Sequence, residues 1–398
     1  MPNPINRLPF PMPDAIPREH WDHYPWNRWT FQNVRQMVAT AEVWRGSGAV
    51  WELPEHPTNL DELLFDDAEG ATRSIREWMQ LDCNDGFVVL HNGAVVYERY
   101  NNEMTQRSLH LSQSMAKSVT ASVAGILIGR GLLEPEKPVT DYLPELDATA
   151  YKGATLRDVL DMASGVHYTE DYEDLNSHIA ALDIACGWKL PREGADSPDC
   201  MWDHILSLTE LAEPHGTRFN YRSIETDIIA HCMERVTSKR LPVLVSEEIW
   251  QPLGCEESAD FSVDRTGYAL ASGGLSASLR DYARFGQMLC NGGVGNGKRI
   301  VPFEWISDTT RSDAREIDEY RKKAMPNGGY RNQFWLRDRD RRILMARGIF
   351  GQLIYVDRDL DLVAVVLSSW PESVNVDRNI NSFKAIDAIA EALSLHGE

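Results

Sequence analysis

The sequence predicts an α/β protein in which one antiparallel sheet is flanked by helices and carries an inserted, mostly helical subdomain. Three observations support this: residues 86–100 form a hairpin pattern, residues 352–367 form two strand patterns, and the middle of the chain is mostly helical in pattern. We therefore expect three parts. They are an N-terminal arm with first helices packed on the body (1–80), an α/β domain (81–139 and 266–398) and a helical subdomain (140–265).

The composition is that of a soluble globular protein. The chain has 398 residues, of which 43% are hydrophobic and 25% charged, and its formal net charge is −20. Such a charge argues against general binding to nucleic acids or anionic membranes. No apolar run could span a membrane, the N-terminus lacks a signal-peptide pattern, and the six scattered cysteines suit reduced thiols. These features predict a cytoplasmic protein.

The N-terminal segment is expected to be an extended arm. Its first 25 residues hold seven of the 20 prolines, which excludes a regular helix or a central strand. Four aromatic residues of this segment are expected to pin it to the body by packing: Trp21, Tyr24, Trp26 and Trp29.

The hairpin is predicted by Asn92-Gly93 between the apolar runs Phe-Val-Val-Leu and Ala-Val-Val-Tyr, because both turn residues need positive φ. A helix is expected to follow from Ser114 to about Gly131, where apolar residues recur every three or four positions.

Helical patterns continue through the middle of the chain. Thr155 and Asp158 have the spacing of a capping box, and residues 225–236 form another helical run. Further on, residues 352–357 and 362–367 are predicted strands. The second is apolar on both faces, as in a central strand, and a final helix over about 379–395 is expected to cover it.

Ser114 and Lys117 form the central chemical motif, Ser114-Met-Ala-Lys117. Residues three apart share a helix face, so the lysine amine can reach the serine hydroxyl. A serine hydroxyl becomes a useful nucleophile when a neighbouring base takes its proton, and a buried lysine amine can be that base. Free N–H groups at the helix start can hold an oxyanion. The S-x-x-K pattern is the signature of penicillin-binding proteins and class A β-lactamases.

Two further segments support this interpretation. Phe219-Asn-Tyr221-Arg-Ser223 precedes a helical run about a hundred residues later, and a tyrosine there can relay a proton to a leaving group. Arg347-Gly348-Ile349-Phe350-Gly351-Gln352 places glycines beside a strand. That arrangement allows close approach of a substrate, and a free strand N–H could complete an oxyanion hole with the N–H of Ser114.

With these motifs in place, the chain resembles the serine β-lactamase and penicillin-binding-protein-like superfamily, and within it the 6-aminohexanoate-dimer hydrolases. The resemblance runs from about residue 25 to residue 371. Besides the motifs above, it includes Tyr168-Thr-Glu-Asp-Tyr172, Cys186-Gly-Trp188 and Ser272-Gly-Gly274.

The resemblance implies a role for each matching residue. Ser114 is the nucleophile, Lys117 its base and Tyr221 the proton relay. Ile349 supplies the N–H that completes the oxyanion hole with Ser114. In the substrate-binding part, Tyr172 closes over the substrate on a mobile loop and Asp183 holds its amino end. Ser272 and Phe350 stand where larger polar residues are expected in this group.

The implied activity is a cofactor-free and metal-free hydrolysis of a small-molecule amide or ester through an acyl-enzyme, in a possible homodimer. Where β-lactamases have Lys-Thr-Gly this chain has Gly348-Ile-Phe, so it lacks the cation that holds a β-lactam carboxylate. Two alternatives remain. One is a carboxylesterase of the same type, and the other is a penicillin-binding-type module that binds peptides without turnover.

Two other groups of residues are expected to lie on the surface. His167 and Glu170 fall near the presumed lid and could touch substrate, although surface roles are the expectation. Residues 311–342 mix basic with acidic side chains, which favours a solvated surface over an anion-binding patch.

Overall fold

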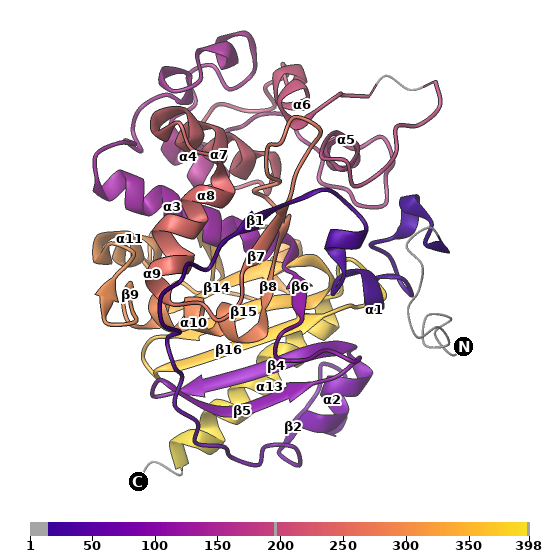
Figure 1. Cartoon of the computed structure of the whole chain (residues 1–398), viewed down its shortest axis with the longest axis vertical. Coiled ribbons are helices and arrows are strands. Elements are labelled where there is room, and N and C mark those ends of the chain that lie inside the picture. Colours follow the sequence, from indigo (N-terminus) through magenta and orange to yellow (C-terminus); the bar gives the residue numbers. More distant parts are fainter. Residues whose placement is uncertain (1–14, 195–196, 396–398) are drawn as a thin grey trace.

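The computed structural model describes residues 15–194 and 197–395, so residues 1–14 of the predicted arm lie outside the described part. Its main sheet has eight antiparallel strands in the order β11-β12-β13-β14-β15-β16-β4-β5 (Figure 1). In that order the strands are Arg315–Glu316, Gly329–Arg331, Phe334–Asp338, Ile343–Gly348, Gln352–Asp357, Leu362–Ser368, Asn84–His91 and Ala94–Tyr100. Strands from both ends of the chain therefore form one sheet, as the sequence predicts.

The centre of this sheet follows from local sequence. β16 is buried along its whole length between β15 and β4, as its apolar run predicts. Val363 and Val365 face one hydrophobic core, and Ala364 and Val366 face the other. The β4–β5 hairpin turns at Asn92-Gly93, whose φ angles are both positive.

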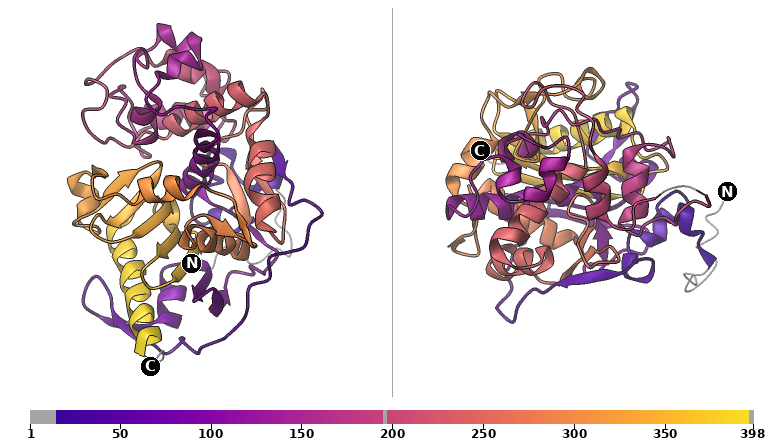
Figure 2. Two further views of the ribbon diagram at one scale, coloured as in Figure 1. Left: turned by 90° about the vertical axis from the view of Figure 1, so that its left-hand side faces the viewer. Right: turned by 90° about the horizontal axis from the view of Figure 1, so that it is seen from above.

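Helices cover both faces of the main sheet (Figure 2). α13 (Val376–Leu395) and α2 (Ile75–Leu81) contribute to the core on one face, and α10 (Leu279–Cys290) packs on the other against β4, β15 and β16. α13 is the predicted final helix and begins three residues earlier than expected. α10 lies very close to the sheet, because a Cβ at Gly286 would be 2.6 Å from the Val363 side chain.

A second sheet was not predicted. Its strands follow the order β1-β7-β8-β6, with bounds Thr40–Val43, Ala259–Ser262, Leu275–Ser278 and Leu109–Leu111. β7 lies within the range that we expected to be mostly helical. Two small ribbons complete the strands: β2 (Leu64–Asp66) with β3 (Thr72–Ser74), and β9 (Val294–Gly295) with β10 (Lys298–Arg299).

A helical layer lies above the main sheet in Figure 1. The capping box at Thr155 and Asp158 is present, and α7 matches the predicted run over 225–236. The layer contains α3 (Ala116–Gly129), α4 (Leu156–Leu160), α5 (His178–Ala185), α6 (Met201–Ser207), α7 (Ile224–Thr237) and α8 (Leu241–Val245). The remaining α-helices are α1 (Asn27–Thr30), α9 (Gln251–Leu253), α11 (Phe303–Thr309) and α12 (Glu319–Lys322).

The N-terminal aromatics are not equivalent. Trp21 is fully buried and packs edge-on against Trp188 at 5.3 Å, and Trp26 and Trp29 pack on the core. Tyr24 is 45% exposed, so the expectation that it pins the arm is wrong.

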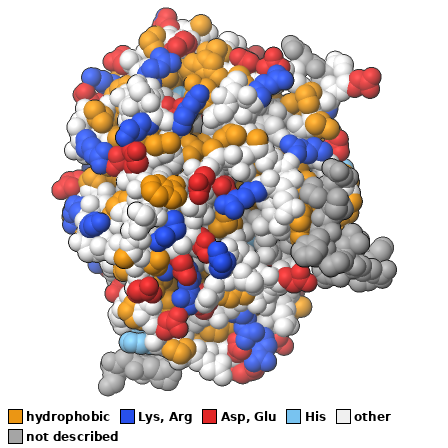
Figure 3. All heavy atoms as spheres, in the orientation of Figure 1, with side chains coloured by type: hydrophobic (Ala, Val, Ile, Leu, Met, Phe, Trp, Pro, Cys, Tyr) orange, Lys and Arg blue, Asp and Glu red, His pale blue; other side chains and the backbone are white. Residues whose placement is uncertain are grey.

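Within the described ranges, no helix has the length and apolar character to cross a membrane. The face shown in Figure 3 carries acidic and basic side chains interspersed.

Candidate active site

Ser114 and Lys117 lie in direct contact. Ser114 sits in a short 3-10 turn (Gln113–Met115) immediately before α3, so the α-helix begins two residues later than the pattern predicts. The Lys117 Nζ donates a hydrogen bond of 3.0 Å to the Ser114 Oγ. Ser114 is half-buried while its neighbours Gln113 and Met115 are buried, which leaves the hydroxyl accessible from one side.

Lys117 is held by two further acceptors. Only 2% of it is exposed, and its Nζ donates to the Ser223 Oγ at 3.1 Å and to the Ser272 carbonyl oxygen at 2.6 Å. A neutral lysine amine has two N–H donors and one lone pair. If those two donors remain on Ser223 and Ser272, the lone pair faces Ser114. The three contacts thus fit an amine that accepts the serine proton.

Glu170 completes a network behind the lysine. The Ser223 backbone N–H donates to the Glu170 carboxylate at 2.9 Å, and the Ser223 hydroxyl donates to it as well. The Tyr172 hydroxyl donates to the same carboxylate at 2.8 Å. Since the Ser223 proton is held by Glu170, the Ser223 oxygen is left as an acceptor for Lys117.

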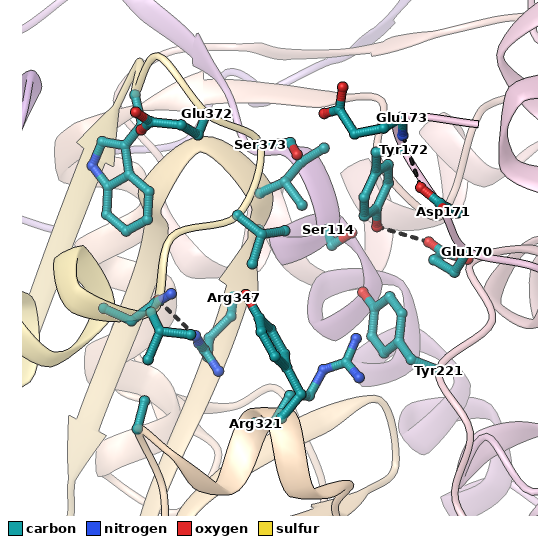
Figure 4. A pocket seen from close by; sticks show the side chains of 18 of the residues that line it. Ser114, Glu170, Asp171, Tyr172, Glu173, Tyr221, Arg321, Arg347, Glu372 and Ser373 are labelled. Carbon is teal, nitrogen blue, oxygen red and sulfur yellow. Dashed lines mark hydrogen bonds between the residues drawn. The ribbon is translucent and has the colours of Figure 1, made fainter. Parts of the chain in front are cut away.

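Tyr221 lies beside the lysine. Its ring stacks on Trp335, with centroids 5.4 Å apart, and the Lys117 Nζ lies 5.2 Å from the centre of the Tyr221 ring. In Figure 4 the side chains of Tyr172 and Tyr221 point toward one another next to Ser114. The structure therefore brings these two tyrosines to the predicted nucleophile.

Two cavities meet at Ser114. The larger has a volume of about 860 Å³, and its lining includes Tyr221, Arg321 and Arg347. The smaller, of about 60 Å³, is lined by Asp183 among others. Five residues line both cavities: Ser114, Tyr172, Glu173, Ile349 and Ser373. A substrate bound across Ser114 would extend into both.

The end of β14 approaches the nucleophile closely. A Cβ at Gly348 would lie 2.5 Å from the Ser112 carbonyl oxygen and 3.0 Å from the Ser114 nitrogen, so only glycine fits there. This contact brings Ile349 next to Ser114. Gln113, immediately before Ser114, has a φ of 48°, a left-handed conformation that ordinarily costs a non-glycine residue about 1–2 kcal/mol.

Asp183 lines the smaller cavity from α5. Burial raises the pKa of its carboxyl to about 7, and the neighbouring negative charge of Asp22 adds to this effect. The Asp183 carbonyl accepts hydrogen bonds of 2.9 Å from the backbone N–H groups of Trp188 and Lys189, which fixes the end of the helix. A cationic ligand in this cavity would stabilise the ionised carboxylate.

Ser272 and Phe350 also line the smaller cavity, and both are buried. Ser272 contributes its carbonyl oxygen to Lys117, while its N–H bonds to the Asp227 carboxylate at 3.3 Å. Phe350 packs edge-on against Phe31, with ring centroids 5.4 Å apart. Neither residue was expected to have these contacts.

Four residues around the site were missed or misplaced by the sequence analysis: Glu170, Ser223, Arg321 and Arg347. Glu170 was expected at the surface, and Arg321 belongs to the mixed-charge segment 311–342, which was also expected there. Glu170 and Arg321 line the larger cavity instead. His167, in contrast, packs against His178 with ring centroids 5.3 Å apart. Over residues 15–194 and 197–395, no group of three or more His, Cys, Asp or Glu side chains could hold a metal ion.

Comparisons with known proteins identify the family of this chain. Residues 84–386 match the family model described as "Beta-lactamase". The chain belongs to the β-lactamase family. It is 36% identical to the 6-aminohexanoate-dimer hydrolase of Paenarthrobacter ureafaciens over 360 residues, which cover 89% of this chain and 88% of the relative.

Solved structures of other proteins show the same fold. The structure named "Putative 6-aminohexanoate-dimer hydrolase from Bacillus anthracis" superposes with a TM-score of 0.88 at 30% identity, covering 97% of this chain and 99% of that one. EstCE1, described as a hydrolase with promiscuous acyltransferase activity, has a TM-score of 0.61 at 15% identity, covering 79% and 98%, and shows the fold alone. The predicted fold and resemblance are confirmed, and the chain is a hydrolase of this family.

Proposed function

We propose that this protein is a serine hydrolase that cleaves linear amides of the 6-aminohexanoate-dimer type through an acyl-enzyme on Ser114. The observation that carries the proposal is the 3.0 Å contact between the Lys117 Nζ and the Ser114 Oγ, made by a lysine whose other two contacts are acceptors. The similarity to the 6-aminohexanoate-dimer hydrolase over most of both chains supports the substrate class.

In the first half of the reaction the Ser114 proton passes to the Lys117 Nζ as the Ser114 Oγ attacks the amide carbonyl carbon. The N–H groups of Ser114 and Ile349 stabilise the oxyanion. Tyr221 gives its hydroxyl proton to the leaving nitrogen, the C–N bond breaks and the amine departs. Tyr221 regains a proton from Lys117, whose Nζ lies 5.2 Å from the centre of the Tyr221 ring.

In the second half a water molecule replaces the amine. The same groups take its proton, the water oxygen attacks the acyl carbon, and the Ser114 Oγ leaves with a proton. The acyl part of the substrate occupies the smaller cavity, where Asp183 binds a terminal ammonium. Tyr172 covers the scissile amide while its hydroxyl contacts Glu170.

A carboxylesterase is the second candidate. The Ser114–Lys117 contact would serve both reactions, and an ester needs less help from Tyr221 because an alkoxide or phenoxide leaves more readily than an amine. A peptide-binding module without turnover is the third possibility, and the experiment below distinguishes it.

The test combines active-site labelling with a substrate panel. A fluorophosphonate probe should add one label at Ser114, and Ser114→Ala should abolish labelling and turnover together. The panel contains the linear 6-aminohexanoate dimer, short p-nitrophenyl esters, D-peptides and nitrocefin. Hydrolysis of the dimer supports the amidase, and hydrolysis of esters alone supports the esterase. Labelling at another residue, or binding without turnover of any substrate, would refute the proposal.

A further inference from the structure

Arg347 is a half-buried cation in the wall of the larger cavity. It extends from β14 into the larger cavity, where its Nη2 donates to the Asn379 Oδ1 at 2.6 Å and its Nη1 lies 3.5 Å from the Met325 sulfur. Its guanidinium lies over the rings of Trp335 and Phe383 at 5.5 and 5.6 Å. Among the residues that the structure describes, no carboxylate oxygen lies within 4.0 Å of it.

This environment is unfavourable for the free protein. A charge that is partly removed from water loses hydration, and an opposite charge would compensate that loss. Burial, together with the nearby Arg321 guanidinium, lowers the pKa of Arg347 to about 10, so the group stays cationic at neutral pH. Arg337 makes a useful contrast: it also lies over Phe383, at 5.1 Å, but it is paired with the Asp387 carboxylate.

Arg321 adds a second cation to the same wall of the cavity. From α12 it lies over the Tyr221 ring at 5.2 Å and over the Trp335 ring at 5.4 Å, and it is paired with Asp318. Figure 4 shows Arg321 and Arg347 below Ser114, while the acidic side chains of the cavity lie to the right of Ser114 or above it. That acidic set is Glu170, Asp171, Glu173 and Glu372.

Arg321 and Arg347 line the larger cavity, Asp183 lines the smaller one, and the two cavities meet at Ser114. If the acyl part of the substrate enters the smaller cavity, the leaving part must enter the larger one. A linear amide with an amino group at one end and a carboxylate at the other would then place each charge near its opposite.

We propose that Arg347, assisted by Arg321, binds a carboxylate on the leaving part of the substrate. The preferred substrates would then be linear amides whose amine product is an amino acid. The inference rests on the proposed function, because it uses the assignment of the two cavities to the acyl and leaving parts. Arg347, near the end of β14, supplies this cation, whereas the following segment Gly348-Ile349-Phe350 contains none.

The kinetic test compares two substrates that differ only at the far end. They are the linear 6-aminohexanoate dimer and the same dimer with a terminal carboxamide. A charge-assisted contact predicts a kcat/KM that is about 10- to 100-fold higher for the acid. Arg347→Met should remove this preference by lowering the rate on the acid alone, and Arg347→Lys should retain part of it.

Arg337→Met is the matched control. It removes a guanidinium over the same Phe383 ring but outside the cavity, so a merely structural effect on α13 should appear in both variants. Equal kcat/KM values of the wild-type enzyme on the two substrates would overturn the proposal. So would an equal loss on both substrates in Arg347→Met, or a loss of the preference in Arg337→Met.

A binding measurement separates this inference from the proposed activity. Calorimetry with Ser114→Ala protein should show 6-acetamidohexanoate binding about 10-fold or more tightly than 6-acetamidohexanamide, and Arg347→Met in the same background should remove the difference. If the dimer is not hydrolysed but the difference is present, the carboxylate site stands and the activity is wrong. If the two compounds bind equally, the carboxylate site is refuted even in an active amidase.

Discussion

Replacement of Glu170 by glutamine should lower kcat more than it changes KM. Glu170 accepts hydrogen bonds from the Ser223 hydroxyl, the Ser223 backbone N–H and the Tyr172 hydroxyl. A glutamine offers one carbonyl oxygen where the carboxylate offers two acceptors, so one of these donors would face an NH2 group. A contact to a charged group is worth about 1.5–3 kcal/mol, and its loss corresponds to roughly 10- to 150-fold in rate.

The chemical reason lies in Ser223. With Glu170 present, the Ser223 proton is occupied and its oxygen accepts from the Lys117 Nζ. Without the carboxylate, the Ser223 hydroxyl can turn and donate to the lone pair of the neutral amine. That lone pair would then no longer be free for the Ser114 proton. Glu170 is therefore a positioning residue, and the loss should appear in kcat more than in KM.

The assay is steady-state and burst-phase hydrolysis of p-nitrophenyl acetate, a small ester. Glu173→Gln is the control, because Glu173 is a neighbouring carboxylate of the same cavity whose backbone N–H is bound by Asp171. Ser223→Ala combined with Glu170→Gln should lose no more than the single variants if both act through Lys117. A Glu170→Gln rate within about twofold of the Glu173→Gln rate, or fully additive losses, would refute the reasoning.

Three further outcomes are expected. Lys117→Arg keeps the charge but removes the base, so turnover of a p-nitrophenyl ester should fall by roughly 10²-fold or more; near-normal turnover would assign the base elsewhere. Burial raises the pKa of Asp183 to about 7, so kcat/KM for the amino-terminated dimer should rise with pH between about 6 and 8 as the carboxylate forms. This rise should be absent with a neutral ester substrate and in the Asp183→Asn variant. Gly348→Ala places a Cβ 3.0 Å from the Ser114 nitrogen, so denaturant unfolding should show a free energy of unfolding lower by about 1–3 kcal/mol, and the rate of hydrolysis should fall. Gly48→Ala, whose Cβ meets nothing within 4 Å, should change neither quantity.

The parts of the fold that could be predicted are those set by neighbouring residues. Asn92-Gly93 adopts the positive φ angles that its hairpin requires, and Thr155 caps its own helix. β16 is apolar on both faces because it is central. In each case the interactions that decide the structure lie within a few residues, so the sequence displays them directly.

The second sheet was missed because its strands are short and its order is non-local. β6 has three residues, and β1 reaches the sheet from near the N-terminus to pair with β7 more than two hundred residues later. Such strands lack a period long enough to recognise, and their burial comes from other segments. The left-handed conformation of Gln113 is likewise imposed from outside, since glutamine has no preference for it.

The site divides in the same way. Ser114 and Lys117 are three residues apart, so their contact is a property of one turn of helix. Ser223 and Ser272 reach the same lysine from more than a hundred residues away. A Ser-x-x-Lys motif therefore indicates where a nucleophile can be, but the groups that decide which way its base faces come from the rest of the fold.

Arg321 and Arg347 show why charge in a sequence is a poor guide to binding. Within the mixed segment 311–342, Arg311 is paired with Asp313 and both side chains are exposed, as expected for a solvated surface. The residue order does not mark Arg321 as a lining residue of the larger cavity, because its guanidinium lies over the rings of Tyr221 and Trp335, which come from other segments of the chain. Arg347 differs from these arginines because, within residues 15–194 and 197–395, no carboxylate oxygen lies within 4.0 Å of it, and this can be seen only in the folded structure. The presence of this cation in the cavity that contains Ser114 therefore follows only from the fold. We expect a carboxylate of the substrate to pair with it.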